Sequence, residues 1–247
     1  MQTRPPATVL AGRYALEEEL GRSGTGMAWR AEDRLLGRTV TIKLVHPGLG
    51  DDPAFAGRLA DEARRVASLS ATGLARLLDS GEEQGLPFLV REHVEGVSAR
   101  SRLERTGPLA PEVASRIAIA ALEALALAHD AGVLHLHLQI DDVLVTPDGD
   151  VFVTDLAVGP AVTATRSPAE AAQLLGGDGL APEQSETGVV DERTDVFAVG
   201  AILFELLTGE PPARRRSPRQ VRPSVPRALD RVVSRALAPA PAERFDG

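Results

Sequence analysis

The sequence predicts an α+β protein in two parts, a strand-rich first third and a mainly helical remainder. In the first third, short β-branched runs alternate with glycine-bearing turns. Beyond it, longer apolar stretches repeat with helical spacing. The two textures meet near residues 92–96, as expected for two separately packed parts. We expect a disordered lead-in at 1–11, a β-rich part at 12–95 and a helical part at 96–247.

The composition excludes several classes of function. The 247 residues carry a net charge of -8, which disfavours a general nucleic-acid or anionic-membrane surface. The sequence has no cysteine, so disulfides and thiolate chemistry are excluded and a reducing cytoplasm is permitted. Residues 1–8 do not resemble a signal peptide, and the most apolar stretch, 117–127, is too short to span a bilayer. We therefore expect a soluble chain without direct membrane insertion.

The first part contains five expected strands and one helix. The strands are expected at 13–20, 27–31, 39–45, 74–79 and 87–93. The helix is expected at 52–69, because Asp52-Pro53 is a typical helix start. Four apolar residues, Phe55, Leu59, Ala63 and Val66, then fall on one helical face.

The second part alternates helices with one short hairpin. Helices are expected at 97–105, 111–131, 195–207 and 228–238, with Gly209 ending the third. Strands are expected at 143–145 and 151–153, joined by Pro147-Asp148-Gly149. Loops are expected at 158–180, which is rich in Gly, Ala and Thr, and at 213–227, which is basic and proline-rich.

Polar residues gather on both sides of this hairpin. His135, His137, Gln139, Asp141 and Asp142 precede it, and Asp155 follows it. Carboxylates and imidazoles in this arrangement can hold a divalent cation or provide a general base. The His-x-His pair also permits a zinc site, although no third ligand is visible.

This stretch resembles the catalytic loop and metal-binding turn of protein kinases, in particular the eukaryotic-like Ser/Thr kinases of bacteria. The family pattern H-R-D-x-K-P-x-N, a hairpin, then D-F-G is written here as residues 135–142, the hairpin, and Asp155-Leu156-Ala157. Three further segments match scaffold motifs of the family: Ala181-Pro182-Glu183, Asp195 to Gly200, and Leu206 to Pro212.

The resemblance implies a protein-kinase-like bilobal fold, with a small β-rich N-lobe and a larger helical C-lobe. It covers nearly the whole chain and stops at Phe245, where the family's last helix would begin. Within the scaffold motifs, Glu183 is expected to pair with Arg244. Asp195 is expected to hold the backbone of the catalytic loop.

The resemblance also assigns the nucleotide-binding residues. Gly21, Gly24 and Gly26 match the glycine-rich loop, whose second glycine and valine are replaced by Ser23 and Ala28. Lys43 matches the lysine that contacts the α/β-phosphates, and Glu62 matches its helix partner. In the hinge, Glu92 and Val94 match positions that line the adenine pocket.

Arg91 falls at the back of that adenine pocket, where the family has an apolar residue. One interpretation is that a partner such as Glu62 or Asp155 holds the guanidinium in the pocket and occludes it. The alternative is a one-residue shift that places Arg91 on the solvent face. Thr41 replaces the alanine that forms the floor of the pocket.

In the catalytic loop the family's chemical groups are replaced. His137 stands in place of the aspartate that orients the substrate hydroxyl, and Gln139 in place of the lysine that neutralises the transferred phosphoryl group. Leu136 replaces an arginine, while His135 matches a structural histidine. We therefore expect no catalytic residues. Asp142 and Asp155 remain as candidate Mg²⁺ ligands.

These replacements predict a pseudokinase, a regulatory or scaffolding protein-interaction module that requires no cofactor. One alternative is a divergent active Ser/Thr kinase that uses ATP and Mg²⁺ through Lys43, Glu62, Asp142 and Asp155, with His137 as an unusual base. A third is a pseudokinase that binds nucleotide without transferring phosphate.

The resemblance also implies partners and a location. Family members often form the cytoplasmic part of longer membrane proteins, and some degenerate members are phosphorylated and then recruit phosphothreonine-reading domains. The expected partners are accordingly proteins, including an active Ser/Thr kinase and such a reading domain. The candidate acceptors are Thr163, Thr165, Ser167 and Thr187, although for each one alone the simpler expectation is no modification. The basic run Arg214-Arg215-Arg216 is expected to be a solvated loop.

Overall fold

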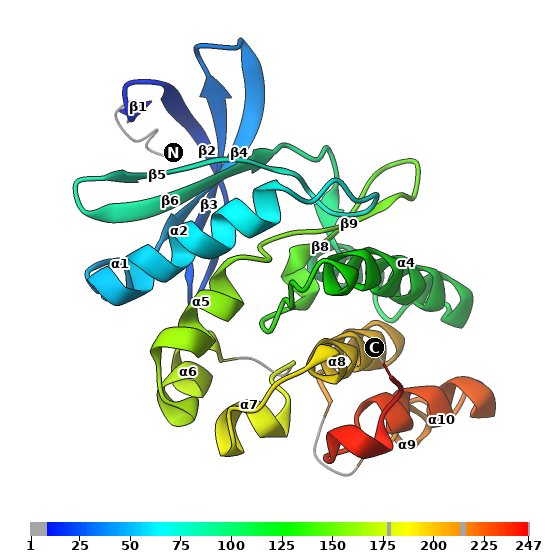
Figure 1. Ribbon diagram of the computed structural model, residues 1–247. Coiled ribbons are helices and arrows are strands. Elements are labelled where there is room, and N and C mark those ends of the chain that lie inside the picture. Colours follow the sequence, from blue (N-terminus) through cyan, green and yellow to red (C-terminus); the bar gives the residue numbers. More distant parts are fainter. Residues whose placement is uncertain (1–8, 177–178, 213–215, 247) are drawn as a thin grey trace. The chain divides into compact units, whose positions relative to one another are not determined.

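The computed structural model describes residues 9–176, 179–212 and 216–246, and the chain divides into two compact units. Unit 1 comprises Met1–Ser70 and Ala75–Val94. Unit 2 comprises Ala71–Leu74 and Glu95–Gly247. Figure 1 shows strands concentrated in the first unit and helices in the second.

Unit 1 is built on a six-stranded antiparallel sheet in the order β1-β2-β3-β4-β6-β5. Its strands are β1 Val9–Leu10, β2 Tyr14–Ser23, β3 Gly26–Asp33, β4 Arg38–Val45, β5 Leu77–Glu83 and β6 Leu86–Glu92. Two helices follow β4, namely α1 Pro47–Gly50 and α2 Pro53–Ala67, and α2 packs against β5 (Figure 1).

The alternation of side chains along β4 explains how this sheet builds a core. Val40 and Ile42 point to one face, where they join the apolar residues Leu10, Tyr14, Ala31, Phe88 and Val90. Thr41 and Lys43 therefore point to the opposite face. This opposite face of β4 carries the residues that the sequence assigned to nucleotide binding.

Helix α2 begins as its sequence predicts. The side chain of Asp52 accepts a hydrogen bond from the backbone N–H of Ala54 at 2.9 Å, and Pro53 takes the first helical position. Its buried face contains the four expected apolar residues and one carboxylate, Glu62.

Unit 2 consists mainly of helices. They are α3 Ala99–Thr106, α4 Pro111–Asp130, α5 Val158–Thr165, α6 Pro168–Leu175, α7 Pro182–Glu186, α8 Glu192–Thr208, α9 Pro218–Val221 and α10 Arg227–Ala236, with 3-10 turns at Ile140–Asp142 and Pro241–Glu243. A small sheet has the order β7-β8-β9, from Val97–Ser98, Val143–Val145 and Val151–Val153. Helix α8, almost entirely buried, packs against both α4 and α10 (Figure 1). It ends at Gly209, whose φ of 85° is left-handed, as predicted.

Two expectations for unit 1 need correction. Val9 and Leu10 are not part of a disordered lead-in, because they pair with Ala15 and Tyr14 and Leu10 is buried in the core. The strand expected at 74–79 instead begins at Leu77, where pairing with β6 starts. Residues 1–8 lie outside the described residues.

Two expected loops of unit 2 contain helices. Within 158–180, residues 158–165 form α5 and residues 168–175 form α6, because the small apolar residues of α5 are buried and α6 has a capping box. In that box the backbone N–H and hydroxyl of Ser167 donate to Glu170 at 3.0 and 2.6 Å. Within 213–227, Pro218–Val221 forms the helical turn α9. The basic run at 214–216 falls partly outside the described residues.

No helix in the described part of the chain combines the length and the apolar character needed to cross a membrane.

Candidate functional site

The glycine-rich segment forms the hairpin between β2 and β3. Gly24 and Thr25 make its turn, and the backbone N–H of His46 donates to the carbonyl of Thr25 at 2.9 Å. A Cβ added to Gly26 would lie 2.1 Å from the carbonyl oxygen of Leu44, so β4 itself requires a glycine there. A Cβ added to Gly21 would contact nothing within 4 Å. Sheet packing alone therefore explains the glycine at position 26.

Lys43 and Glu62 are both buried, with exposures of 4% and 3%. Lys43 lies on β4 opposite Ala28 and Leu89. The carboxylate of Glu62 forms an ion pair with Nη2 of Arg58, one helical turn earlier on α2, at 2.6 Å. Arg58 was not among the predicted site residues, although its spacing of four residues from Glu62 favours a pair along a helix.

Arg91 lies on the same face of the sheet as Lys43. The register places Arg91 opposite Thr41 and Leu89 opposite Lys43, so these side chains share a face. The ring nitrogen Nδ1 of His93 lies 2.9 Å from the hydroxyl of Thr41, which is only 2% exposed. The imidazole of His93 therefore contacts Thr41, the residue at the predicted floor of the adenine pocket. A buried hydroxyl needs a hydrogen-bond partner, and His93 provides it for Thr41.

Of the other two hinge residues, Glu92 lies opposite Val40 and therefore on the other face of the sheet. The carboxylate of Glu92 accepts a hydrogen bond from the backbone N–H of Arg76 at 2.8 Å, and the N–H of Glu92 donates to the Arg76 carbonyl at 2.9 Å. Val94 is half-buried. These two hydrogen bonds join Glu92 to the segment that leads into β5.

In unit 2 the catalytic loop is held by Asp195 of α8, as predicted. Its carboxylate accepts the backbone N–H groups of His135 and Leu136, each at 2.8 Å, and also contacts Nε2 of His129 at 2.8 Å. These contacts fix Leu136 at a φ of 58°, a left-handed conformation that costs a non-glycine residue about 1–3 kcal/mol.

His135 is a structural residue. It is completely buried, and its Nε2 donates to the carbonyl of Thr154 at 2.8 Å. Its Nδ1 accepts the backbone N–H of His137 at 3.4 Å. Both ring nitrogens are thus engaged, so His135 has no lone pair left for a metal ion.

His137 and Gln139 contact the end of α6. Nε2 of His137, which is 8% exposed, lies 2.9 Å from the carbonyl oxygen of Leu175. The side-chain amide of Gln139 lies 3.0 Å from the same imidazole nitrogen and donates to the carbonyl of Gly176 at 3.3 Å. The two residues that replace the family's aspartate and lysine are therefore both directed to the backbone of Leu175 and Gly176.

Helix α5 closes on the same loop. A Cβ added to Gly159 would lie 2.3 Å from the carbonyl oxygen of His135 and 3.0 Å from Cβ of His137. Only a glycine allows the helix to pack this closely against the loop. The segment after Asp155 thus covers the catalytic-loop backbone at Gly159 and the His137 imidazole at Leu175.

The two candidate Mg²⁺ ligands lie on either side of the β8–β9 hairpin. The carboxylate of Asp142 accepts the backbone N–H of Gln139 at 3.0 Å. Asp155 adopts a left-handed φ of 68°. Among the described residues, no group of three or more His, Cys, Asp or Glu side chains could hold a metal ion. An Mg²⁺ ion between these two carboxylates would need further oxygen ligands, such as phosphates or water.

A second charged contact joins the catalytic loop to α3 and α8. Arg100 of α3 donates to Asp141 at 3.3 Å and also pairs with the buried Glu205 of α8. Neither Arg100 nor Glu205 is predicted from the sequence, because they are far apart in sequence and match no motif.

The Glu183–Arg244 pair forms as predicted. The two nitrogens Nη1 and Nη2 of Arg244 each donate to one carboxylate oxygen of Glu183 at 2.7 Å, and both residues are buried. Burial alone would raise the pKa of Glu183, but hydrogen bonds from Arg244 and Thr194 hold that pKa below its ordinary value.

The six-stranded sheet with helix α2, and the helical unit with its catalytic-loop geometry, define the protein kinase fold. The chain belongs to the protein kinase family, since the family model described as the protein kinase domain matches residues 14–237.

Relatives of the chain are named bacterial Ser/Thr kinases. The chain is 34% identical over 257 residues to the serine/threonine-protein kinase PknB of Mycolicibacterium smegmatis, a match that covers 96% of this chain and 41% of that protein. It is 33% identical over 260 residues to PknL of Mycobacterium tuberculosis, covering 98% and 65%. The chain thus spans well under half of PknB and about two thirds of PknL.

Solved structures show the same fold. A double-mutant form of the Mycobacterium tuberculosis PknI kinase domain superposes with a TM-score of 0.83 at 27% identity, covering 97% of this chain and 92% of that one.

Proposed function

We propose that this chain is a non-catalytic member of the protein kinase family that acts as a regulatory or scaffolding module through protein contacts. The observation that carries this proposal is the pairing of His137 and Gln139 with the carbonyls of Leu175 and Gly176. These contacts engage the two side chains that stand where the family has its aspartate and lysine, which supports a non-catalytic role.

The chemistry of these two residues supports the same conclusion. An imidazole lacks the negative charge of a carboxylate, and an amide supplies no cation where phosphoryl charge develops. Removing one such group typically lowers the rate by about 10²–10³-fold. Because such effects are not additive, the combined loss has no simple sum.

A phosphotransfer assay tests this proposal. We expect wild-type protein, given ATP with Mg²⁺ or Mn²⁺, to label neither itself nor a generic Ser/Thr peptide above the background set by the Asp155→Asn variant. Clear labelling above that background would overturn the proposal. Labelling by the double variant H137D/Q139K would show that the remaining site residues support phosphotransfer. The variant Glu104→Gln, at an exposed position, is the control for protein preparation.

A second candidate is a divergent active Ser/Thr kinase. Its support is that Lys43 and Glu62 are buried, that Asp142 and Asp155 are present, and that the relatives are named kinases. A ligand that binds only the folded protein raises the melting temperature by mass action. A melting temperature raised by ATP only in the presence of Mg²⁺, together with labelling, would favour this candidate. The same shift without labelling would favour a nucleotide-sensing module.

The proposal includes its partners and location. We infer a cytoplasmic module that an active Ser/Thr kinase phosphorylates and a phosphothreonine-reading domain then binds. Thr187 is the only exposed one of the three threonines, with its hydroxyl donating to the Glu183 carbonyl at 3.3 Å, whereas Thr163 and Thr165 are half-buried in α5. Ser167 is exposed too, but its hydroxyl donates to Glu170.

A further inference from the structure

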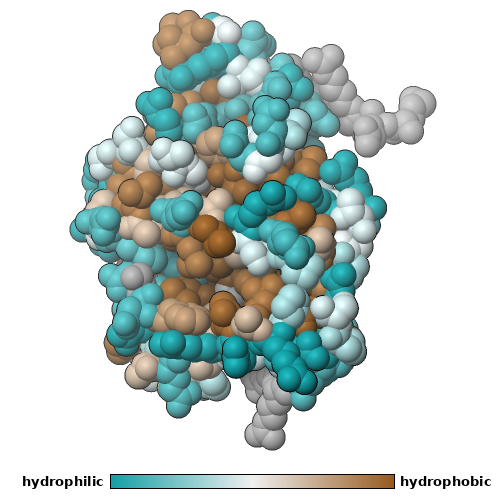
Figure 2. Space-filling view, turned by 90° about the vertical axis from the view of Figure 1, so that its right-hand side faces the viewer, coloured by the Kyte–Doolittle hydropathy of each residue, from teal (hydrophilic) through white to brown (hydrophobic). Residues whose placement is uncertain are grey.

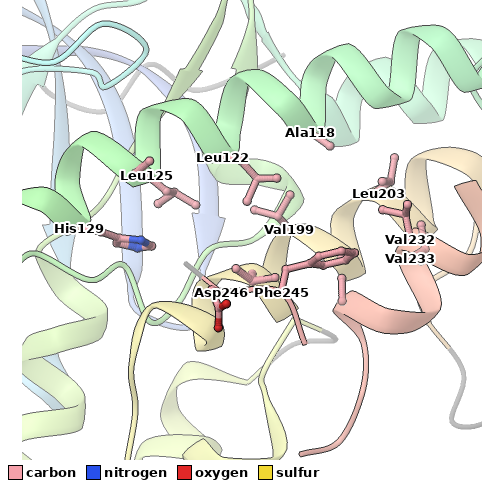
Figure 3. A pocket seen from close by; sticks show the side chains of 14 residues that line it. Ala118, Leu122, Leu125, His129, Val199, Leu203, Val232, Val233, Phe245 and Asp246 are labelled. Carbon is pink, nitrogen blue, oxygen red and sulfur yellow. The ribbon is translucent and has the colours of Figure 1, made fainter. Parts of the chain in front are cut away.

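Two features of the molecule are not used by the proposed function, a cavity in unit 2 and the ion pair of α2. The cavity has a volume of about 240 Å³ and is lined by α4, α8 and α10 beside Phe245 (Figure 3). Apolar residues surround a hollow on that face of the molecule (Figure 2). Nothing in the structure shows what covers this surface. The ion pair, in contrast, involves Glu62, a residue assigned to nucleotide binding.

Helix α2 lies on the side of the sheet that carries Lys43. The apolar cluster on the other side, built around Val40 and Ile42, has no described member from α2. Yet α2 contacts β5 and buries Glu62 together with its apolar residues. Because side chains alternate along a strand, Lys43 and Arg91 point away from that cluster. Glu62, Lys43 and Arg91 therefore lie on the same side of the sheet.

The carboxylate on this side is held by Arg58. Within the described ranges, the ion pair that Glu62 forms is the one with Nη2 of Arg58. The Nε of Arg58 is buried and has no hydrogen-bond acceptor in the part of the chain that the structure describes. By contrast, Arg244 meets Glu183 with two nitrogens on two oxygens. The pair of Arg58 with Glu62 is thus the less complete of the two, and a competing cation can replace it more easily.

Lys43 is the single lysine of the chain. Of the 27 lysines and arginines, the other basic residues are all arginines. An ammonium is a compact group with three rotatable donors, whereas a guanidinium is a planar fork. The chain thus carries its one ammonium at the position where the family contacts the α/β-phosphates. The group that would hold a phosphate is present, and its carboxylate partner is engaged by Arg58.

We propose that Arg58 competes with Lys43 for the Glu62 carboxylate and so keeps Lys43 from its phosphate-binding position. In protein kinases the lysine of this strand acts on the phosphates when it is paired with the helix glutamate. Arg58 takes that carboxylate within α2. This autoinhibitory contact belongs to unit 1 and is independent of the replacements at His137 and Gln139. It rests on the assignment of Lys43 and Glu62 to nucleotide binding, the basis of the second candidate function.

Isothermal calorimetry with ATP and Mg²⁺ tests the competition. Arg58→Met keeps an unbranched side chain and removes the competing charge, which leaves Glu62 available to Lys43. This variant should bind ATP at least about tenfold more tightly than wild type. Adding Lys43→Met should remove the gain. Equal or weaker binding by Arg58→Met, or a gain that survives Lys43→Met, would overturn the proposal.

The matched control is Arg65→Met. Arg65 is an exposed arginine in the last turn of the same helix, so this variant removes the same charge from α2. Its affinity for ATP should stay within about twofold of the wild-type value. A similar gain in both variants would mean that the net charge of the helix controls binding, and would overturn the role of Arg58.

Urea unfolding gives a second test that needs no nucleotide. It compares Arg58→Met, Lys43→Met and the double variant. If either cation can neutralise Glu62, the loss in the folded-to-unfolded ratio of the double variant should exceed the product of the two single losses by at least about tenfold. The reason is that the buried carboxylate loses both of its partners only in the double variant. Losses that multiply within about twofold would overturn the proposal.

The same three variants in the Glu62→Gln background assign the coupling to this carboxylate. There the losses should multiply within about twofold, because no charge remains for the two cations to share. Coupling that persists without the carboxylate would overturn the proposal. Since these readouts are binding and stability, labelling of a substrate by the wild-type protein would contradict the proposed function alone.

Discussion

Two polar networks of unit 2 differ in how their groups are paired. Around Arg244 all five guanidinium N–H groups have an acceptor: the Glu183 carboxylate and the carbonyls of Arg193, Ala238 and Pro239. Around His137, one ring nitrogen lies within hydrogen-bond distance of both the Leu175 carbonyl and the Gln139 amide. That nitrogen cannot donate to the first and accept from the second at once.

The comparison separates residues that hold the fold from residues that perform chemistry. The Glu183–Arg244 network and Asp195 keep the family's motif, and each group there has a partner in the fold. In the family, the residues at these two positions orient the substrate hydroxyl and neutralise the transferred phosphoryl group. Here the positions are occupied by His137 and Gln139, and the fold is kept. A polar group that the fold itself requires is therefore a better guide to architecture than to activity.

The largest expected effect comes from breaking the complete network. Glu183→Gln should lower the free energy of unfolding by about 3–5 kcal/mol, because it leaves the buried charge of Arg244 uncompensated. Urea unfolding measures this change. The control is Glu210→Gln, since Glu210 pairs with Arg216 on the surface and such pairs contribute about 0–1 kcal/mol. Equal losses in the two variants would refute the assigned role of the network.

A smaller effect is expected from opening the second network. Gly159→Ala should destabilise the protein by about 1–3 kcal/mol, because its Cβ meets the His135 carbonyl at 2.3 Å. Gly57→Ala on α2 meets nothing within 4 Å and should stabilise by about 0.5–1 kcal/mol. Thermal unfolding compares the two. A neutral Gly159→Ala would mean that α5 does not pack tightly on the catalytic loop.

The smallest effect is expected in the pH dependence, because burial opposes the hydrogen bonds that set the pKa of Glu183. Its folded pKa lies below the ordinary 4.5, so its contribution to stability is complete above that pH and is lost as the pH falls through the folded value. The stability difference between wild type and Glu183→Gln should therefore shrink below about pH 4.5. Denaturant melts at pH 7 and in acid measure it, and a constant difference would contradict the assigned pKa direction.

Much of the fold could be predicted because local signals agreed with tertiary structure. The hairpin strands at 143–145 and 151–153 have the predicted bounds, since an Asp-Gly turn and β-branched runs specify them together. Helix α6 was missed although Ser167 and Glu170 have capping-box spacing. The high glycine and alanine content of residues 158–180 favoured a loop in the prediction and outweighed the capping-box spacing.

The candidate site was less predictable because its contacts join distant segments. His137 and the Leu175 carbonyl are 38 residues apart, and backbone carbonyls leave no mark in the sequence. The contact between Arg100 and Glu205 spans 105 residues and follows from helix packing alone. By contrast, the roles of Glu183 and Asp195 were predictable because motif spacing identifies both.

The position of Arg244 has a consequence for biosynthesis. Glu183 leaves the ribosome 61 residues before the arginine that neutralises it. Until Arg244 emerges, α7 and α8 can pack only around a Glu183 carboxylate that has no counter-ion, and burying this unpaired charge disfavours their final packing. Unit 2 is therefore expected to complete its folding only after Arg244 has emerged, when unit 1 has already left the ribosome.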